Sequence, residues 1–235
     1  MLKVEFHSHS SDDPIDGIPY STQDLIDRAA ALGYDALAVT LHDRQLDIRL
    51  FESYAMQRRI VLIPGTERTI EGRHVLLLNF SHATEHVQSF EDLRGLKQQE
   101  PSGLVIAPHP FFPAGSALRR FATRYADLFD AVEYNAMFTT TLNFNEPAER
   151  WAREHGKPMV GNGDVHRLEQ MGTTYSLVDA PRNAAAICEA VRAGDVKVVA
   201  NPISWGFAAR IIGSLYWAKY FDRTVRPAQP VQATA

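Results

Sequence analysis

The 235-residue chain contains one cysteine, Cys188, so it cannot form an internal disulfide, and nothing in it requires an oxidising compartment. It has no run of about 18 apolar residues and does not start with the charged-then-apolar pattern of a signal peptide. It also has no excess of positive charge, because 28 acidic residues outnumber 24 basic ones. These absences argue against a membrane protein or a general nucleic-acid coat, and they favour a cytoplasmic location.

The chain does have enough apolar sequence, 45% of its residues, for one large core. Short apolar segments alternate with helical patterns, which favours parallel strands joined by crossover helices. A capping box of Ser21 and Asp24 predicts one of the helices, which we expect to end before Gly33. The seven strands that we expect in this alternation begin at Val4, Asp35, Ile60, His74, Leu104, Ala131 and Pro158. A further short strand is expected at Val196 to Ala200. The fold class is therefore α/β, either a barrel or a doubly wound sheet.

We expect residues 1–203 to form this domain. Residues 204–222 are rich in apolar and aromatic side chains, among them Trp205 and Trp217. This composition predicts a helical extension packed across the underside of the domain or against a second subunit, so a homo-oligomer is one expectation. Residues 223–235 are expected to form a disordered tail.

Two pairs of residues with ligating side chains lie two positions apart, His7 with His9 and Asp164 with His166. In extended backbone such residues point to the same side, so each pair can hold one ion. Further candidates lie at the boundaries of other apolar segments, at His42, Glu67, His74 and His109. In a β/α barrel the carboxyl ends of the strands converge on one face, where ligands scattered along the sequence can meet.

An acidic loop follows His9. Carboxylates beside paired imidazoles suit zinc, manganese or iron better than calcium, which prefers oxygen ligands alone. Either Asp12 or Asp16 could be the ligand from this loop while the other caps the loop. The Asp16-Gly17 context favours Asp16.

These motifs resemble those of the PHP family, the polymerase and histidinol phosphatase family of metal-dependent phosphoesterases. The family opens with His-x-His, an Asp or His in the next loop, a helix, and an apolar strand that ends in Thr-Asp-His. The corresponding segments here are His7-Ser8-His9, Asp16-Gly17 and Thr40-Leu41-His42. The later motifs are matched, in the same order, by Pro64-Gly65-Thr66-Glu67, His74, Ala107-Pro108-His109-Pro110 and Gly163-Asp164-Val165-His166-Arg167.

The resemblance implies a distorted, TIM-like (β/α)7 barrel with a metal cluster at the carboxyl ends of its strands. It implies two or three divalent ions of zinc, manganese or iron, with Glu67 as a bridging ligand. The ligands would be His7, His9, Asp16, His42, Glu67, His74, His109, Asp164 and His166.

The activity implied is hydrolysis of a phosphate monoester or diester by a hydroxide formed from metal-bound water. His42 or His166 would protonate the leaving group. The expected substrate is a small phosphorylated molecule, and nucleic acid is expected only as a short substrate. One residue departs from the family pattern: Leu41 stands where the family usually has an Asp, which we would expect to orient the neighbouring histidine.

Phosphate esters also need cationic partners, and Arg44, Arg68, Arg73 and Arg167 each lie beside a proposed ligand. A guanidinium can bind phosphate through two hydrogen bonds, although an arginine in such a place is about as often part of a structural ion pair. We single out Arg44 and Arg167 as the predicted substrate-binding residues.

Two other interpretations stay open. The first is a PHP-like domain that keeps its metals for structure or partner binding without turnover. The second is a zinc peptidase, because the segment His82-Ala83-Thr84-Glu85-His86 matches the His-x-x-Glu-His pattern of inverted zinc peptidases. That pattern would require His82, Glu85 and His86 to lie on one helix.

Overall fold

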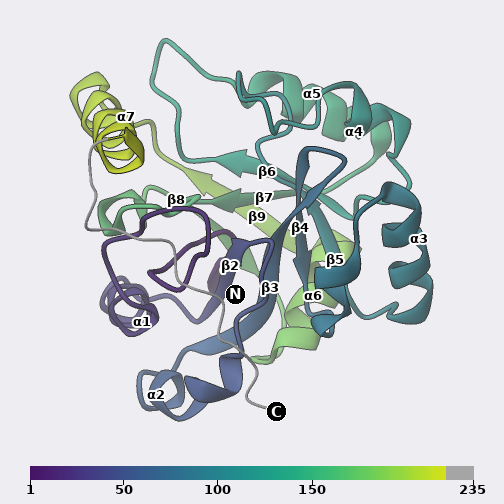
Figure 1. Ribbon diagram of the computed structural model, residues 1–235, viewed down its shortest axis with the longest axis horizontal. Helices are drawn as coiled ribbons and strands as arrows, with labels where there is room; N and C mark the ends of the chain where they lie inside the picture. Colours follow the sequence, from purple (N-terminus) through teal and green to yellow (C-terminus); the bar gives the residue numbers. More distant parts are fainter. Residues whose placement is uncertain (221–235) are drawn as a thin grey trace.

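The computed structural model describes residues 1–220, with side chains up to Trp217, so the tail expected at 223–235 lies outside the described residues. One nine-stranded sheet curls into a nearly closed barrel, and the helices surround it (Figure 1). The strands are β1 (Leu2–Glu5), β2 (Ala36–His42), β3 (Val61–Ile70), β4 (Arg73–Leu78), β5 (Leu104–Ala107), β6 (Ala131–Asn135), β7 (Met159–Asn162), β8 (Thr174–Val178) and β9 (Val196–Ala200). The helices are α1 (Thr22–Ala31), α2 (Glu52–Gln57), α3 (Phe90–Gln99), α4 (Arg120–Arg124), α5 (Glu146–His155), α6 (Ala184–Ala193) and α7 (Trp205–Tyr220), with short 3-10 turns η1 (Ile48–Leu50), η2 (His82–His86) and η3 (Leu168–Gln170).

The sheet is mixed, which differs from the all-parallel barrel of seven strands that the sequence indicated. The strand order is β7-β6-β5-β4-β3-β2-β1-β8-β9, and β4 runs antiparallel to both β3 and β5. A two-residue turn of Glu71 and Gly72 joins β3 to β4, and its positive φ angles of 48° and 76° suit a tight hairpin. The α/β class is confirmed, but the count of seven strands is not, because β8 and β9, which α6 connects, add an antiparallel pair beside β1.

Two contacts join β7, at one end of the sheet, to β8 and to the segment after β1. Beyond β1, Ser8 forms a parallel bridge with Val165, supported by bonds from His9 N to Val165 O (3.1 Å) and from Val165 N to His7 O (3.2 Å). Along β7, the Gly161 N–H donates to Ser176 Oγ of β8 at 3.0 Å. A Cβ on Gly161 would lie only 2.6 Å from the Tyr175 carbonyl oxygen, so this close approach requires glycine.

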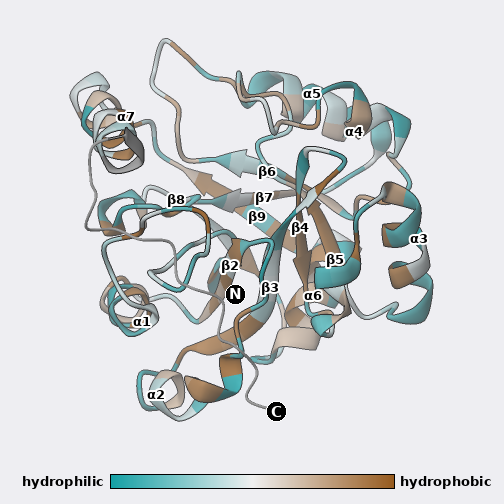
Figure 2. Cartoon of the chain, in the orientation of Figure 1, coloured by the Kyte–Doolittle hydropathy of each residue, from teal (hydrophilic) through white to brown (hydrophobic). Residues whose placement is uncertain are grey.

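Strands β2, β4 and β5 are apolar over most of their length (Figure 2), as expected for strands with helices on one face and the barrel interior on the other. In β4, Val75 and Leu77 pack with α3, α4 and α5, whereas the alternate residues Leu76 and Leu78 pack in the barrel interior. The interior cluster also includes Ile187, Cys188 and Val191 of α6. Helix α6 therefore covers the barrel interior. The sequence had predicted the C-terminal extension, residues 204–222, as one candidate for a helix in that position.

Helix α7 covers most of that extension and lies at the side of the barrel (Figure 1). Ala208 and Ile211 are buried, the Trp205 indole donates to Thr141 Oγ1 (3.1 Å), and Arg167 donates to the Ser214 carbonyl (3.1 Å). Among the described residues, no helix combines the length and the apolar character that crossing a membrane requires.

Candidate metal centre

The fold brings all nine predicted ligands to one rim of the barrel. His7 and His9 follow β1, His42 ends β2, His109 follows β5, and Asp164 and His166 follow β7. Glu67 pairs with His42 in the ladder between β2 and β3. His74 lies near the start of β4, and it reaches the same rim because β4 runs in the opposite direction to its neighbours. The ninth residue, Asp16, comes from the loop between β1 and α1.

Glu67 lies at the centre of this cluster, and its side chain is 1% exposed. Its Oε2 atom lies 3.2 Å from His7 Nε2, 3.4 Å from His9 Nε2 and 3.2 Å from His42 Nε2. Its Oε1 atom lies 2.7 Å from His74 Nδ1 and 3.2 Å from His109 Nε2. The two oxygens thus face different groups of imidazoles, which is the arrangement of a carboxylate between two ions.

The second carboxylate at the centre is Asp164. Its Oδ1 atom lies 3.3 Å from His166 Nδ1, 3.4 Å from His7 Nε2 and 3.7 Å from His9 Nε2. Both Asp164 and His109 have positive φ angles, 48° and 28°, which non-glycine residues adopt at a cost. Such strain is concentrated at functional sites, where the surrounding structure holds it in place.

The acidic loop places its three aspartates differently. Asp16 lines the cavity, with Oδ2 3.0 Å from His166 Nε2. Asp12 instead accepts hydrogen bonds from Ser10 Oγ (3.3 Å) and Thr22 Oγ1 (2.8 Å), which ties the loop to α1. Asp13, which the sequence interpretation did not select, is buried and contacts the rings of His9 and His42. Of the two residues that the sequence left open, Asp16 is the one that lines the cavity.

Two buried glutamates at this rim were also missed. Glu133 of β6 accepts from His7 Nδ1 (2.9 Å) and from the His109 backbone N–H (2.5 Å). Glu5 of β1 accepts from the backbone N–H groups of His7 (3.1 Å) and Gly163 (3.0 Å). Burial raises the pKa of Glu5 to about 8, although these backbone bonds oppose the change. The sequence did contain a signal for both residues, because Glu5 and Glu133 are each a charged residue within a short, largely apolar strand.

The charges of the cluster depend strongly on one another. Burial by itself would lower the pKa of His7, but the carboxylates of Asp164, Glu67 and Glu133 raise it well above its usual value. Burial would likewise raise the pKa of Glu67, yet the imidazoles of His7, His74 and His42 hold it well below its usual range. Positive charge at the centre is therefore needed to balance the buried carboxylates.

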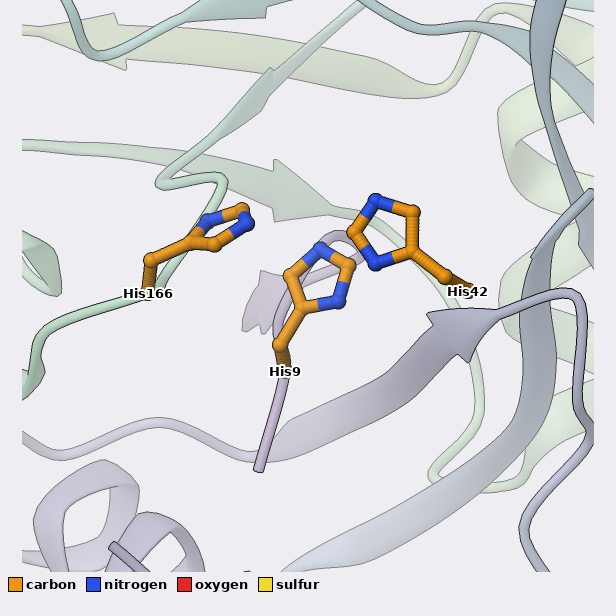
Figure 3. A group of neighbouring side chains, drawn as sticks. All are labelled: His9, His42 and His166. Carbon is orange, nitrogen blue, oxygen red and sulfur yellow. The ribbon is translucent and has the colours of Figure 1, made fainter. Parts of the chain in front are cut away.

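Divalent cations fit these residues. The Nε2 atoms of His7 and His9 are buried, and neither has a hydrogen-bond partner in the described part of the chain. An orphaned imidazole nitrogen is costly unless it meets a donor or a metal ion. The ligand atoms lie within 4.8 Å of one another in several sets, including His9 with His42 and His166, His7 with His9 and Asp164, and His42 with Glu67 and His74. Figure 3 shows the rings of His9, His42 and His166 gathered from three separate segments.

A cavity of about 250 Å³ opens over the cluster. Its wall is formed by seven predicted ligands and by part of the loop after β5, namely Asp16, His42, Glu67, His74, His109, Asp164, His166, Phe112, Ala114 and Ser116. This mixture of carboxylate, imidazole and small neutral side chains suits a polar group that is itself held by cations.

The arginines beside the motifs are outside this lining. Arg167 donates to the carbonyl oxygens of His166 (2.8 Å) and Ser214 (3.1 Å), so its guanidinium is used in tying α7 to the rim. Arg44 has only a long contact, 3.5 Å, to the Asp12 carbonyl. Arg68 pairs with Asp43 at 2.9 Å, and Arg73 donates to the Ala117 carbonyl at 3.2 Å. Of the four, Arg44 is the least committed to a partner within the chain.

The segment with the peptidase-like spacing has a different structure. His82–His86 forms the 3-10 turn η2, in which residues four apart do not share a face. His82, Glu85 and His86 are exposed, and Glu85 accepts from the Gln45 backbone N–H at 3.1 Å. Within the described residues, none of the three is in a group able to hold a metal. The geometry therefore does not support the peptidase interpretation.

Comparisons with known proteins agree with the motifs. A family model described as PHP-associated matches residues 143–196. No curated protein sequence matches the chain. The match to the family model confirms the resemblance to the PHP family that the motifs indicate.

Several solved structures share this fold at low sequence identity. A two-domain protein from Bacteroides vulgatus, which contains a predicted PHP-like metal-dependent phosphoesterase, is 20% identical with a TM-score of 0.66, covering 91% of this chain and 69% of its own. PsfC from Pseudomonas syringae is 17% identical with a TM-score of 0.60, covering 93% and 97%. The lesion-specific endonuclease PfuEndoQ from Pyrococcus furiosus is 14% identical with a TM-score of 0.56, covering 84% and 57%. At these identities, the likeness shows the fold.

Proposed function

We propose that this chain, as a PHP-like protein, is a metal-dependent hydrolase that cleaves a phosphate ester. One observation carries the proposal: Glu67 faces five imidazoles, three with Oε2 and two with Oε1. A buried carboxylate that reaches two groups of ligands suits a pair of closely spaced ions. Two or three ions of zinc, manganese or iron would be held by the nine residues of the rim.

We assign the ligands as follows. His7, His9, Glu67 and Asp164 would hold the closely spaced pair, with Glu67 between the two ions. The remaining residues would complete two or three sites; these are Asp16, His42, His74, His109 and His166. When bound, such cations lower the pKa of water and neutralise phosphate oxygens.

The residues of the chain would do the rest of the chemistry. The buried carboxylates Glu133 and Glu5 hold the segments of His7 and His109 in position, so little reorganisation is needed during the reaction. His166 lines the cavity, and its Nε2 atom is 3.0 Å from Asp16. We assign His166, with His42 as the second candidate, to protonation of the oxygen that leaves phosphorus.

The substrate we favour is a small phosphorylated molecule, whose phosphate enters the cavity of about 250 Å³. Arg44 is the preferred cationic partner for the phosphate, and Arg167 the second. A short nucleic acid is the alternative substrate, and the likeness of the fold to a lesion-specific endonuclease supports it. Hydrolysis of a monoester compared with a diester distinguishes the two substrate classes.

The test is elemental analysis of the purified protein, followed by assays of 4-nitrophenyl phosphate and bis(4-nitrophenyl) phosphate with added manganese. We expect about two or more metal ions per chain and turnover of one ester. Glu67→Gln should lose both metal and turnover, while Glu85→Ala should keep both. Bound metal without turnover of either ester would favour the interpretation as a non-catalytic metal-binding domain. Loss of activity in Glu85→Ala but not in Glu67→Gln would favour the zinc peptidase interpretation.

A further inference from the structure

We propose that Asp13 is a positioning residue of the metal centre, which fixes the rings of His9 and His42 so that both present Nε2 to the cluster. The inference rests on the proposed metal centre and extends it to a residue that the motifs do not include. Asp13 comes from the loop between β1 and α1 and is 1% exposed, so water does not compete for its oxygens.

One oxygen of Asp13 serves both histidines. Its Oδ2 atom lies 3.0 Å from His9 Nδ1 and 3.0 Å from His42 Nδ1, and it also accepts from the His42 backbone N–H at 2.9 Å. A carboxylate oxygen can only accept, so both rings must carry a proton on Nδ1. Each Nε2 lone pair is then available to a cation.

The two rings that Asp13 contacts point at Glu67, the carboxylate at the centre of the cluster. His9 Nε2 and His42 Nε2 lie 3.4 Å and 3.2 Å from the same Oε2 atom of Glu67. The two rings are also stacked, with centroids 4.6 Å apart and an angle of 21° between their planes. Asp13 thus sets the directions of two adjacent ligands with one atom.

The other oxygen of Asp13 holds the loop itself. Its Oδ1 atom accepts from the backbone N–H groups of Ile15 and Asp16, both at 2.9 Å. Because Asp16 is the proposed ligand from this loop, the same side chain positions three candidate ligands. Loss of the carboxylate would free two rings and one loop at once.

The structure also shows which carboxylate orients His42 when Leu41 precedes it. Leu41 is fully buried and packs in a cluster with Leu37, Val39 and the residues of α1. Successive residues of a strand face opposite sides, so position 41 faces that core while His42 faces the rim. The orienting carboxylate is supplied by the loop, from Asp13.

The experiment compares Asp13→Asn with Asp12→Asn, a matched change at the adjacent loop residue, which bonds only to Ser10 and Thr22 on its side chain. Asparagine keeps the shape of the side chain but has one acceptor oxygen in place of two. Zinc and manganese affinities are measured by competition with a chromophoric chelator. We expect Asp13→Asn to weaken binding about 10- to 100-fold and Asp12→Asn to leave it unchanged.

A second readout follows the imidazoles directly. In zinc-loaded protein, ¹⁵N spectra of the histidines report which ring nitrogen binds the metal and which carries the proton. We expect Nε2 ligation with Nδ1–H for both His9 and His42 in the wild type, and a mixture of ligating nitrogens in Asp13→Asn. If Asp13→Asn does not fold, Asp13→Glu keeps the charge but displaces it, and it should show a smaller loss of affinity. The role of Asp13 would be overturned if Asp13→Asn had the same metal affinity and the same histidine tautomers as the wild type. It would also be overturned if Asp12→Asn lost as much metal affinity as Asp13→Asn. Absence of metal from the wild-type protein would instead overturn the metal centre.

Discussion

His7 Nδ1 lies 2.9 Å from Oε1 of Glu133, a carboxylate with no exposed surface in the middle of β6. The other oxygen of Glu133 accepts from the His109 backbone at 2.5 Å, where φ is 28°. One side chain therefore orients a ring on the first strand and holds a strained residue after the fifth.

Replacing Glu133 tests this support. Glu133→Ala leaves buried donors without an acceptor, so we expect the free energy of unfolding to fall by about 3 kcal/mol. Metal affinity should fall about 10- to 100-fold, since the ring of His7 loses its orientation. Urea denaturation and metal titration check the two effects. Glu146→Ala, an exposed change at the start of α5, is the control, and similar results from both variants would contradict the role.

Metal binding should stabilise the protein. A ligand that binds only the folded state at 100 times its Kd adds about 2.7 kcal/mol per site. For a chain of this size, that predicts a rise in the unfolding temperature of roughly 5–10 °C per site. Differential scanning calorimetry with EDTA and then with excess manganese measures the change. An unfolding temperature that does not respond to any of zinc, manganese and iron(II) would be incompatible with the centre.

Arg44 and Arg167 should differ when each is replaced. Arg167 bonds to two carbonyls, so Arg167→Ala is expected to destabilise the fold by about 1–3 kcal/mol by loosening α7. Arg44→Ala should mainly raise KM for the phosphorylated substrate with little change in stability. Steady-state kinetics beside thermal unfolding separates the two effects. A large rise in KM for Arg167→Ala at unchanged stability would assign the phosphate to Arg167.

Cys188 should be inert in the folded protein. It is fully buried in the interior cluster on α6, and burial raises the pKa of its thiol to about 12. The thiolate is the reactive form, so we expect almost no reaction with Ellman's reagent at pH 8 until urea unfolds the chain. A fast stoichiometric reaction of the native protein would show that α6 opens readily.

The homo-oligomer remains a proposal that α7 can test. Ile212 of this helix is 55% exposed and Trp205 is 57% exposed, whereas Ile211 is buried against the barrel. If this face joins two subunits, Ile212→Glu should lower the molar mass measured by light scattering while activity persists. A wild-type monomer at all concentrations would end the proposal.

Much of the candidate site could be predicted from the sequence because its residues follow a fixed order of motifs. His74 was found this way, although its strand was expected to be parallel and is antiparallel. The motif order carried this prediction, and the expected geometry alone would have placed His74 at the opposite rim.

The supporting residues were harder to predict, for physical reasons. No spacing rule relates a loop residue such as Asp13 to rings on two different strands, because the loop path depends on tertiary contacts. Strand β8 carried only a weak signal, since polar and apolar residues alternate in Thr174-Tyr175-Ser176-Leu177, but the buried residues are Thr174, Ser176 and Val178 and not the apolar Tyr175 and Leu177. Its antiparallel place beside β1 follows from pairing across nearly the whole chain, which local patterns do not encode.

The bridge between Ser8 and Val165 joins two segments that are synthesised far apart in time. His7 and His9 leave the ribosome long before Asp164 and His166, and at about 5–20 residues per second the delay is roughly 8–30 s. For that interval the early imidazoles lack the carboxylate and the ring that face them in the finished barrel. Cations captured then would meet an incomplete set of ligands, so we expect the proposed centre to load correctly only at the last stage of folding, after the segment that follows β1 has paired with Val165.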